Sequence, residues 1–334
     1  MVIKEVILPS EKQKIIDFLA KFGLNYEQNI DQTIYLEEDD KVIATVSASK
    51  YIIKCLAADP AYRSENYAAT LVSEMIKRLH MQGVYYYQVF TKAEYRVIFE
   101  SLGFKSLLDT EKVSVLEGGD GDIQTEIKKM QTQIKYGFGI DFTKGNYDIA
   151  CVVVNGNPFT NGHLQLVEHV SKNHDFVLLF VLEEEGSEFS FKERFSMAYL
   201  ATRPCRNVMV LPSTRYVVSK ATFPSYFLKT VDESTAEYAT YDALIFQKYF
   251  MPQLSIVKRY VGTETVDYMS VYNQTLQKVL GNRLEVITRF EENGQVISAR
   301  AVRKLLAEGK LDEALQYIPR TNHPIFLLMD RYKK

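Results

Sequence analysis

The sequence predicts an α/β protein of two domains, and three observations support this. Its 334 residues exceed the roughly 100–200 that one domain usually takes. A glycine-rich stretch, Glu117–Gly121, interrupts the chain between two patterned regions. After it, apolar runs of strand type alternate with helical periodicity, which is the pattern of a parallel sheet covered by helices on both faces. We therefore expect a first domain at 1–116, a linker with one short helix at 117–145 and a second domain at 146–334.

The first domain reads as a small α/β unit. One helix is predicted by the apolar positions Ala68, Leu71, Val72, Met75, Ile76 and Leu79, whose steps of three and one residues have helical period. A second, shorter helix is expected around Glu94–Ser101. Four apolar runs predict strands at Val42–Ala48, Tyr51–Ala58, Val84–Phe90 and Lys112–Leu116.

The second domain should contain five strands and five helices in alternation. We expect the strands near 148–155, 176–182, 207–211, 256–260 and 284–288. We expect the helices near 162–172, 191–202, 236–250, 266–280 and 299–307. In such sheets ligands bind beyond the carboxyl ends of the strands, where a loop leads into a helix N-terminus.

Composition limits the partners and the cellular location. Forty basic and 42 acidic side chains give a net charge of −2, which argues against nucleic acid or an anionic membrane as the main partner. No apolar run approaches the ~18 residues of a membrane span, and the N-terminus has no signal-peptide core. Cys55, Cys151 and Cys205 form no C-x-x-C pair, as in a reducing compartment. We expect a soluble cytoplasmic protein whose cysteines are small buried hydrophobic residues.

The turn between the first strand and the first helix of the second domain carries an unusual set of residues. The strand DIACVVVN is followed by Gly156 and then NPFTNGHLQLVEHV from Asn157 to Val170. Neither a P-loop nor a G-x-G-x-x-G fingerprint occurs, so a phosphate site would have to be built from this turn. Gly156 and Gly162 allow close backbone approach, Pro158 fixes the local path, and free amides at a helix N-terminus favour an anion.

Two side chains in this turn offer chemistry. Thr160 adds a hydroxyl, and His163, on the first helical turn, can stabilise the charge that grows on a phosphorus under attack. The structural alternative is that both residues only cap the helix. The residues of this stretch that we expect at a nucleotide are Asn155, Gly156, Asn157, Pro158, Phe159, Thr160, Gly162 and His163.

A second element lies near the C-terminus, where ISARAVR spans Ile297–Arg303 after the last predicted strand. Ser298 is in N-cap position, and Arg303 projects about one turn further on. At the same edge of the sheet, these two side chains would bind the outer phosphates of a nucleotide. The alternative is a plain capped helix.

A zinc site is a poorer interpretation of the histidines. His163, His169 and His174 lie within twelve residues, but His163 and His169 are six apart on a helix and point in different directions. We therefore predict no metal held by protein ligands.

Together, the two elements resemble the nucleotidyltransferase superfamily that carries a Thr-x-Gly-His turn and an Ile-Ser-Ser-Thr-x-x-Arg element. The sequence departs from that pattern at Ala299 and Arg300. FSFKER at Phe189–Arg194 is similar to a helix start of pantetheine-phosphate adenylyltransferases, and VGTE at Val261–Glu264 looks like the loop that closes over adenine or ribose. The resemblance implies a Rossmann-like domain, His163, Thr160 and Arg303 as catalytic residues, and ATP contacts from Gly262, Glu264, Ser298 and Arg303.

The first domain resembles GCN5-related acetyltransferases. The stretch from Arg63 to Ala68 is similar to their pyrophosphate loop, with Asn66 in place of the central glycine. Asparagine tolerates a left-handed backbone better than most residues, so the loop can be kept. The resemblance implies a site for coenzyme A or a similar prosthetic arm at Ala57, Arg63, Ser64, Asn66, Tyr67 and Ala68.

The combination of the two domains covers nearly the whole chain and resembles the citrate lyase ligase family, as does TFPSYFLK at Thr222–Lys229. This resemblance implies ATP with Mg²⁺ as cofactors, and acetate and the acyl carrier subunit of citrate lyase as partners. Acetate would be activated as acetyl adenylate, and the thiol of the carrier's prosthetic arm would take the acetyl group. Two alternatives stay open: an adenylyltransferase acting on a phosphorylated small molecule, and a nucleotide-binding sensor without activity.

Overall fold

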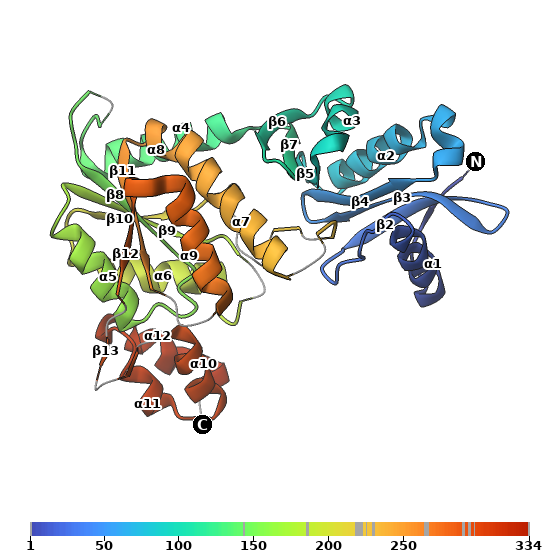
Figure 1. Ribbon diagram of the computed structural model, residues 1–334. Coiled ribbons are helices and arrows are strands. Elements are labelled where there is room, and N and C mark those ends of the chain that lie inside the picture. The colour runs from blue at the N-terminus through green and yellow to red at the C-terminus, as the bar shows by residue number, and fades with distance from the viewer. Residues whose placement is uncertain are drawn as a thin grey trace. The chain divides into compact units, whose positions relative to one another are not determined.

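The computed structural model describes residues 2–142, 144–184, 187–217, 223–224, 226–228, 231–263, 267–288, 291–292, 295–296 and 298–332 (Figure 1). The chain forms two compact units. Unit 1 consists of Met1–Asp122 and Pro224–Glu237, and unit 2 consists of Ile123–Phe223 and Tyr238–Lys334. Both units combine helices with a sheet, so the predicted α/β class is confirmed.

Unit 1 is built on a seven-stranded sheet in the order β1-β2-β3-β4-β5-β7-β6. Its strands are β1 (Ile3–Glu5), β2 (Gln32–Glu38), β3 (Lys41–Ser49), β4 (Ile52–Ala58), β5 (Tyr86–Lys92), β6 (Lys105–Asp109) and β7 (Val113–Gly119). Its α-helices outside the 224–237 segment are α1 (Pro9–Ala20), α2 (Tyr67–Met81) and α3 (Arg96–Ser101). Neighbouring strands are antiparallel except β4 and β5, which are parallel.

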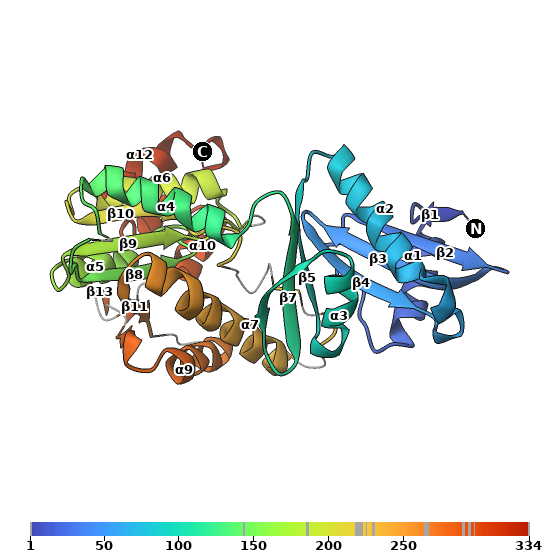
Figure 2. The same cartoon turned by 90° about the horizontal axis from the view of Figure 1, so that it is seen from above.

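Both predicted helices of unit 1 are confirmed, as α2 and α3, and α2 lies across β3 and β4 (Figure 2). Its residues Leu71, Val72, Met75 and Leu79 are buried in the core of this unit. The elements β1, α1, β2 and β6 were not predicted. The start of α1 is capped by Glu11, whose carboxylate accepts from the backbone N–H groups of Ile7 and Leu8, each at 2.8 Å.

Unit 2 contains a five-stranded parallel sheet in the order β10-β9-β8-β11-β12, as the alternation of elements predicted. Its strands are β8 (Ile149–Val154), β9 (Phe176–Val181), β10 (Val208–Pro212), β11 (Ile256–Gly262) and β12 (Leu284–Ile287). Two short strands, β13 (Glu291–Glu292) and β14 (Gln295–Val296), form a separate pair. The first strand of the sheet, β8, is central, so the strand order reverses between β8 and β11. In open parallel sheets this reversal point is where ligands bind.

Helices cover both faces of this sheet. The α-helices that follow unit 1 in the described chain are α4 (Ile123–Phe138), α5 (Asn161–Ser171), α6 (Phe191–Thr202), α7 (Val231–Ile245), α8 (Met251–Gln253), α9 (Asp267–Leu280), α10 (Ala299–Ala307), α11 (Leu311–Leu315) and α12 (His323–Leu328). Leu166 and Val167 of α5 and Met197 and Ala198 of α6 pack with one face, in a core that also includes Val302 of α10. On the other face, Phe180 of β9 packs against Phe246 and Phe250, which follow α7.

The segment predicted as a linker, 117–145, is structured for much of its length. Strand β7 continues to Gly119, and α4 buries Ile127, Met130 and Ile134 and contacts β10 of unit 2. The amphipathic helix expected there is present, and it is part of unit 2. Within the described parts of the chain, we find no helix that is both long and apolar enough to span a membrane.

Candidate active site

The turn between β8 and α5 lies at the carboxyl edge of the central strand, beside the point where the strand order reverses. Gly156 has a φ of +63°, a left-handed conformation that favours glycine. The side chains of Phe159 and Thr160 are buried, at 0% and 1% exposure. The turn is therefore held by the core, and its backbone path is set before any ligand binds.

His163 is the third residue of α5 and reaches back to the residue that caps the helix. The backbone N–H of Thr160 donates to His163 Nδ1 at 3.0 Å, and Thr160 Oγ1 lies 2.9 Å from the same nitrogen. The imidazole also stacks on the Phe159 ring, with 5.2 Å between centroids. A neutral imidazole that accepts at Nδ1 carries its proton on Nε2, so Nε2 is its hydrogen-bond donor. Thr160 thus positions the histidine.

Two backbone amides at the start of α5 are engaged within the protein. Thr160 N–H donates to His163, and Asn161 N–H donates to the backbone oxygen of Tyr317 at 2.9 Å. The sequence predicts that the amides at this helix start are free for an anion. For these two groups the prediction is wrong, because His163 accepts from one amide and Tyr317, 156 positions beyond Asn161, accepts from the other.

The second predicted element contacts the first. Ser298 caps α10, because its Oγ accepts from the backbone N–H of Ala301 at 3.1 Å. Arg303, further along α10, donates from Nη1 to the backbone oxygen of Asn157 in the β8–α5 turn. Two stretches 146 residues apart therefore meet at one edge of the sheet.

Arg194 organises this edge, and sequence reasoning missed it. The side chain is fully buried in unit 2. Its Nη1 donates to the backbone oxygen of Asn155 at 2.7 Å, to Asn155 Oδ1 at 2.9 Å and to the backbone oxygen of Leu182 at 2.9 Å. Its Nη2 donates to the backbone oxygen of Glu184, and its Nε donates to that of Phe189 at 3.0 Å. One guanidinium thereby ties the β8–α5 turn to the loop between β9 and α6.

The same two loops share further contacts. Asn155 Nδ2 donates to Glu184 Oε2 at 3.2 Å, and the backbone N–H of Phe189 donates to Asn157 Oδ1 at 3.1 Å. Burial lowers the pKa of the Arg194 guanidinium, and the Glu184 carboxylate opposes that shift. FSFKER was noted in the sequence as a helix start, and its arginine was the signal that could have pointed to this role.

The remaining predicted ATP-binding residues are only partly described. Gly262 ends β11, the neighbour of β8, and its carbonyl accepts from Asn273 Nδ2 at 3.1 Å. Glu264 lies outside the described residues. Pro158 is buried in the turn, while Gly162 is the second residue of α5.

In unit 1, the predicted arm-binding residues fall at the end of β4 and the start of α2. Ala57 lies in β4, and the backbone of Arg63 and Ser64 is in a 3-10 helix at Pro60–Glu65. Asn66 has a φ of +52°, a left-handed conformation that asparagine tolerates better than most residues. Tyr67 and Ala68 are the first residues of α2.

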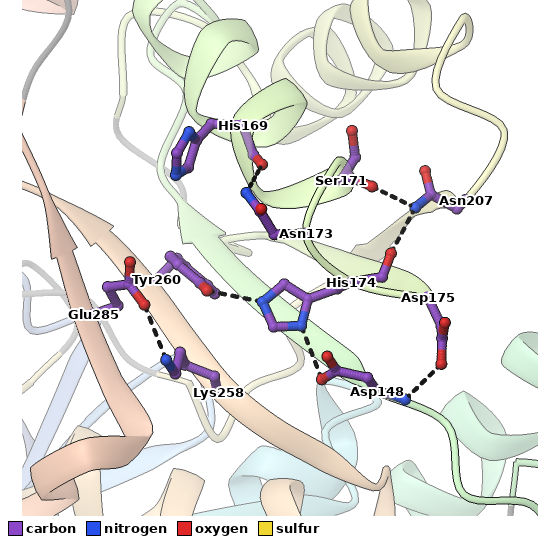
Figure 3. A network of polar contacts seen from close by, with 10 residues as sticks. All are labelled: Asp148, His169, Ser171, Asn173, His174, Asp175, Asn207, Lys258, Tyr260 and Glu285. Carbon is purple, nitrogen blue, oxygen red and sulfur yellow. Dashed lines mark hydrogen bonds and ion pairs between the residues drawn. The ribbon is translucent and has the colours of Figure 1, made fainter.

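The histidines of unit 2 do not gather around a common point. In contrast to His163, His174 lies at the amino-terminal side of the sheet, where Nδ1 is 2.8 Å from Asp148 Oδ1 and Nε2 is 2.8 Å from the Tyr260 hydroxyl (Figure 3). Figure 3 shows His169 turned away from this pair. Among the described residues, no group of three or more His, Cys, Asp or Glu side chains could hold a metal ion.

Comparison with known proteins identifies related chains. The family model for the citrate lyase ligase C-terminal domain matches residues 149–326. Citrate (pro-3S)-lyase ligase of Escherichia coli strain K12 is 30% identical over 322 residues, which cover 93% of this chain and 89% of that protein. The enzyme of the same name from Haemophilus influenzae is 28% identical over 317 residues, with 91% of each chain covered.

Solved structures also match part of the chain. An acetyltransferase of the GNAT family from Staphylococcus aureus Mu50 is 13% identical, covers 35% of this chain and 99% of its own, and has a TM-score of 0.31. The aminoglycoside 6'-N-acetyltransferase of Enterococcus faecium is 12% identical, with 36% and 97% covered and the same TM-score of 0.31. The match of the family model to more than half of the chain, and the relative that is 30% identical along nearly all of it, lead to one conclusion: the chain belongs to the citrate lyase ligase family.

Proposed function

We propose that this protein is an ATP-dependent ligase that acts on citrate lyase. It activates acetate as acetyl adenylate and then acetylates the thiol of the prosthetic arm on the acyl carrier subunit. Family membership supports a ligase of citrate lyase. The observation that carries the adenylate step is the meeting of Arg303 with the β8–α5 turn that positions His163.

The first step needs positive charge and hydrogen-bond donors around a polyphosphate. An acetate oxygen attacks the α-phosphorus of ATP, a new P–O bond forms, and pyrophosphate leaves with the electrons of the broken P–O bond. We assign His163 Nε2 to the α-phosphate oxygens, where negative charge grows as the phosphorus is attacked. Arg303 is assigned to the outer phosphates, since a guanidinium has five N–H donors and can contact Asn157 and a phosphate together.

The second step transfers the acetyl group. The thiol sulfur of the carrier arm attacks the acetyl carbon, a C–S bond forms, AMP leaves, and the thiol proton passes to solvent. The protein would contribute mainly by holding the two reactants together, which removes the cost of a bimolecular encounter. We assign the arm to the residues at the β4 end and α2 start of unit 1, with Asn66 supplying the turn.

Magnesium would arrive with ATP. Mg²⁺ is usually held by substrate phosphates and one or two carboxylates, so a dedicated protein cage is not required. At this edge of the sheet, the Glu184 carboxylate beside Asn155 is an oxygen donor of the kind that Mg²⁺ takes.

Acetate-dependent exchange of labelled pyrophosphate into ATP tests the proposal. We expect exchange that requires acetate and does not require the carrier. Acetylation of the carrier thiol should then consume one ATP and yield AMP and pyrophosphate. If exchange required a phosphorylated small molecule in place of acetate, the protein would be an adenylyltransferase, and the proposal would fail.

A further inference from the structure

The peptide group that joins Gly262 to Thr263, at the end of β11, is held from two sides. The carbonyl of Gly262 accepts from Asn273 Nδ2 of α9 at 3.1 Å. The N–H of Thr263, which belongs to the same peptide group, donates to the backbone oxygen of Ile287 in β12 at 2.8 Å. A trans peptide group is planar, and its carbonyl and N–H point in opposite directions. Two hydrogen bonds to two different elements therefore fix the orientation of this one plane.

This peptide group lies where the strand order of unit 2 reverses. Strand β11 is the neighbour of the central strand β8, and Gly262 is its last residue, at the carboxyl edge of the sheet. Ligands of open parallel sheets bind at this place. Because glycine has no side chain, a ligand can come close to its backbone. Both polar atoms of the peptide group bond within the protein, so what it offers a ligand is mainly its flat face.

Asn273 supplies the side-chain contact, and its neighbour Tyr272 ties the same turn of α9 to β11. The Tyr272 hydroxyl donates to Asp242 Oδ2 at 2.6 Å and accepts from Arg259 Nη2 at 3.1 Å. Arg259 Nη2 also donates to Asp242 Oδ2 at 2.7 Å. Arg259 lies in β11, three residues before Gly262, and Asp242 lies in α7. Two successive residues of α9 thus contact two positions of β11, which sets the place of α9 along the strand.

The groups that hold Tyr272 are buried and charged. Arg259 and Asp242 are each 1% exposed. Burial disfavours the charged guanidinium, but Asp242 and Tyr272 outweigh this effect and raise the pKa of Arg259. Burial also raises the pKa of Tyr272, and Asp242 adds to the shift, so the hydroxyl keeps the proton that it donates. These three side chains therefore remain in the ionisation states that their hydrogen bonds require.

This ion pair is better suited to fixing an arrangement than to adding stability. Among the residues that the structure describes, Arg259 Nε, Arg259 Nη1 and Asp242 Oδ1 have no hydrogen-bond partner. Well-packed apolar side chains are often as stabilising as a buried pair of this kind, because desolvation of the charges is costly. What the pair adds is one defined position of α7 and α9 against β11. The stacking of Tyr238 on Tyr272, with 5.2 Å between centroids, supports the same position.

We propose that Asn273 is a positioning residue for ATP, which holds the peptide group of Gly262 and Thr263 in place against the adenosine part of the nucleotide. The inference rests on the proposed function, in which ATP binds at this edge of the sheet. Asn273 contacts the peptide group and not the nucleotide. Without its amide, the peptide group keeps the hydrogen bond to Ile287 and can turn about it. The peptide then has to be ordered during binding, and the cost of that ordering weakens the affinity for ATP.

Hydrogen exchange of the Thr263 amide, measured by NMR on the full-length protein, tests the contact without any nucleotide. In Asn273→Ala, the protection of this amide should fall about five- to tenfold, as expected when one neutral hydrogen bond is lost. Asn273→Asp keeps the size of the side chain but cannot donate at neutral pH, so its effect should be at least as large. Gln274→Ala, at an exposed position of the same helix, should keep wild-type protection. Unchanged Thr263 protection in both Asn273 variants would overturn the proposal.

Binding of α,β-methylene ATP, which resists cleavage at the α-phosphorus, tests the effect on the nucleotide. By isothermal titration calorimetry, Asn273→Ala and Asn273→Asp should bind this analogue about five- to tenfold more weakly than the wild type. Gln274→Ala should bind it as the wild type does. Wild-type affinity in both Asn273 variants would show that the residue does not position the nucleotide site.

The kinetics of pyrophosphate exchange separate positioning from a general structural role. Asn273→Ala should raise the KM for ATP by the same factor, while kcat and the KM for pyrophosphate stay within about twofold of the wild type. A general loss of structure would lower kcat, and a lost phosphate contact would raise the KM for pyrophosphate. Either result would contradict the role that we assign to Asn273.

The same measurements distinguish failure of this inference from failure of the proposed function. If the wild type bound the analogue but showed no acetate-dependent exchange, the proposed function would be refuted, and the binding data would still decide the role of Asn273. If the wild type showed exchange and the Asn273 variants matched it in KM for ATP, only the present inference would fail.

Discussion

Arg194 Nη1 lies 2.7 Å from the backbone oxygen of Asn155 and 2.9 Å from the side-chain oxygen of the same residue. A buried guanidinium is costly unless its donors are satisfied. Here five hydrogen bonds satisfy it, and all of their acceptors are carbonyl or amide oxygens. These hydrogen bonds fix the positions of two loops at the edge of the sheet where the nucleotide is proposed to bind.

Replacing Arg194 should therefore affect stability and activity together. In Arg194→Met, the carbonyls of Asn155, Leu182 and Phe189 lose their donor, so we expect the free energy of unfolding to fall by about 3 kcal/mol. Displacement of the β8–α5 turn should lower pyrophosphate exchange by about a hundredfold. Urea unfolding and exchange assays measure the two effects. Arg194→Lys should have intermediate stability and activity, since an ammonium can donate to only some of these oxygens. Wild-type exchange by a folded Arg194→Met protein would show that this arginine does not organise the site.

The elements of unit 2 could be predicted because its strands are buried on both faces. Continuous apolar runs such as Ile149–Val154 and Phe176–Val181 give a strong signal in a parallel sheet. The sheet of unit 1 is largely antiparallel, and its strands give a weaker sequence signal. In β2, QTIYLEE begins and ends with polar residues, and its apolar centre is too short to stand out.

Long-range relationships could not be predicted from local pattern. The sequence placed residues 224–237 in the second domain, whereas these residues pack with unit 1. Their partners, such as Asn25 and Phe90 for Tyr226, are remote in sequence, and no periodicity encodes them. Arg194 was passed over for a related reason, because arginine is rarely buried without a carboxylate partner.

His163 offers a test that separates capping from catalysis. His163→Ala should lower acetyl adenylate formation by about a hundredfold or more, since one lost donor to the developing charge costs about 3–4 kcal/mol. It should also lose about 1 kcal/mol of stability, because the Thr160 N–H loses its acceptor.

His163→Gln is the matched control. Glutamine at the third helical position can accept from the capping residue's N–H, so this variant should regain most of the stability. It should not regain the exchange activity, which we assign to Nε2 of the imidazole. If the glutamine variant regained both stability and exchange activity, His163 would only cap the helix.

Arg303 should govern the use of ATP. We expect Arg303→Ala to lower kcat/KM for ATP by about 10- to 100-fold, as expected when a charge-assisted hydrogen bond is lost. The dependence on acetate should change little. Arg300→Ala is the control on the same helix, because its side chain is exposed. Steady-state exchange kinetics at varied ATP concentrations measure kcat/KM for both variants. Equal effects of the two substitutions on kcat/KM for ATP would show that Arg303 does not bind a phosphate.

The network at the amino-terminal side of the sheet should make stability sensitive to alkaline pH. Burial raises the pKa of Tyr260 to about 12, and the Glu285 carboxylate adds to the shift. The folded protein thus holds this proton more tightly than the unfolded chain, whose tyrosines titrate near pH 10. The stability that Tyr260 contributes, with its hydroxyl 2.8 Å from His174 Nε2, is fully present below pH ~10 and is lost as the pH rises through about 12.

Tyr260→Phe should therefore be less stable than the wild type at pH 8, and the difference should shrink steadily between pH 10 and pH 12 as the wild type loses this contribution. Urea unfolding at closely spaced pH values measures it. Tyr136→Phe serves as the control, because Tyr136 is 82% exposed and its removal should leave the pH profile of the wild type unchanged. A Tyr260→Phe profile that runs parallel to the wild type across this range would mean that the phenol proton is not linked to folding. The contact with His174 would then act through packing alone.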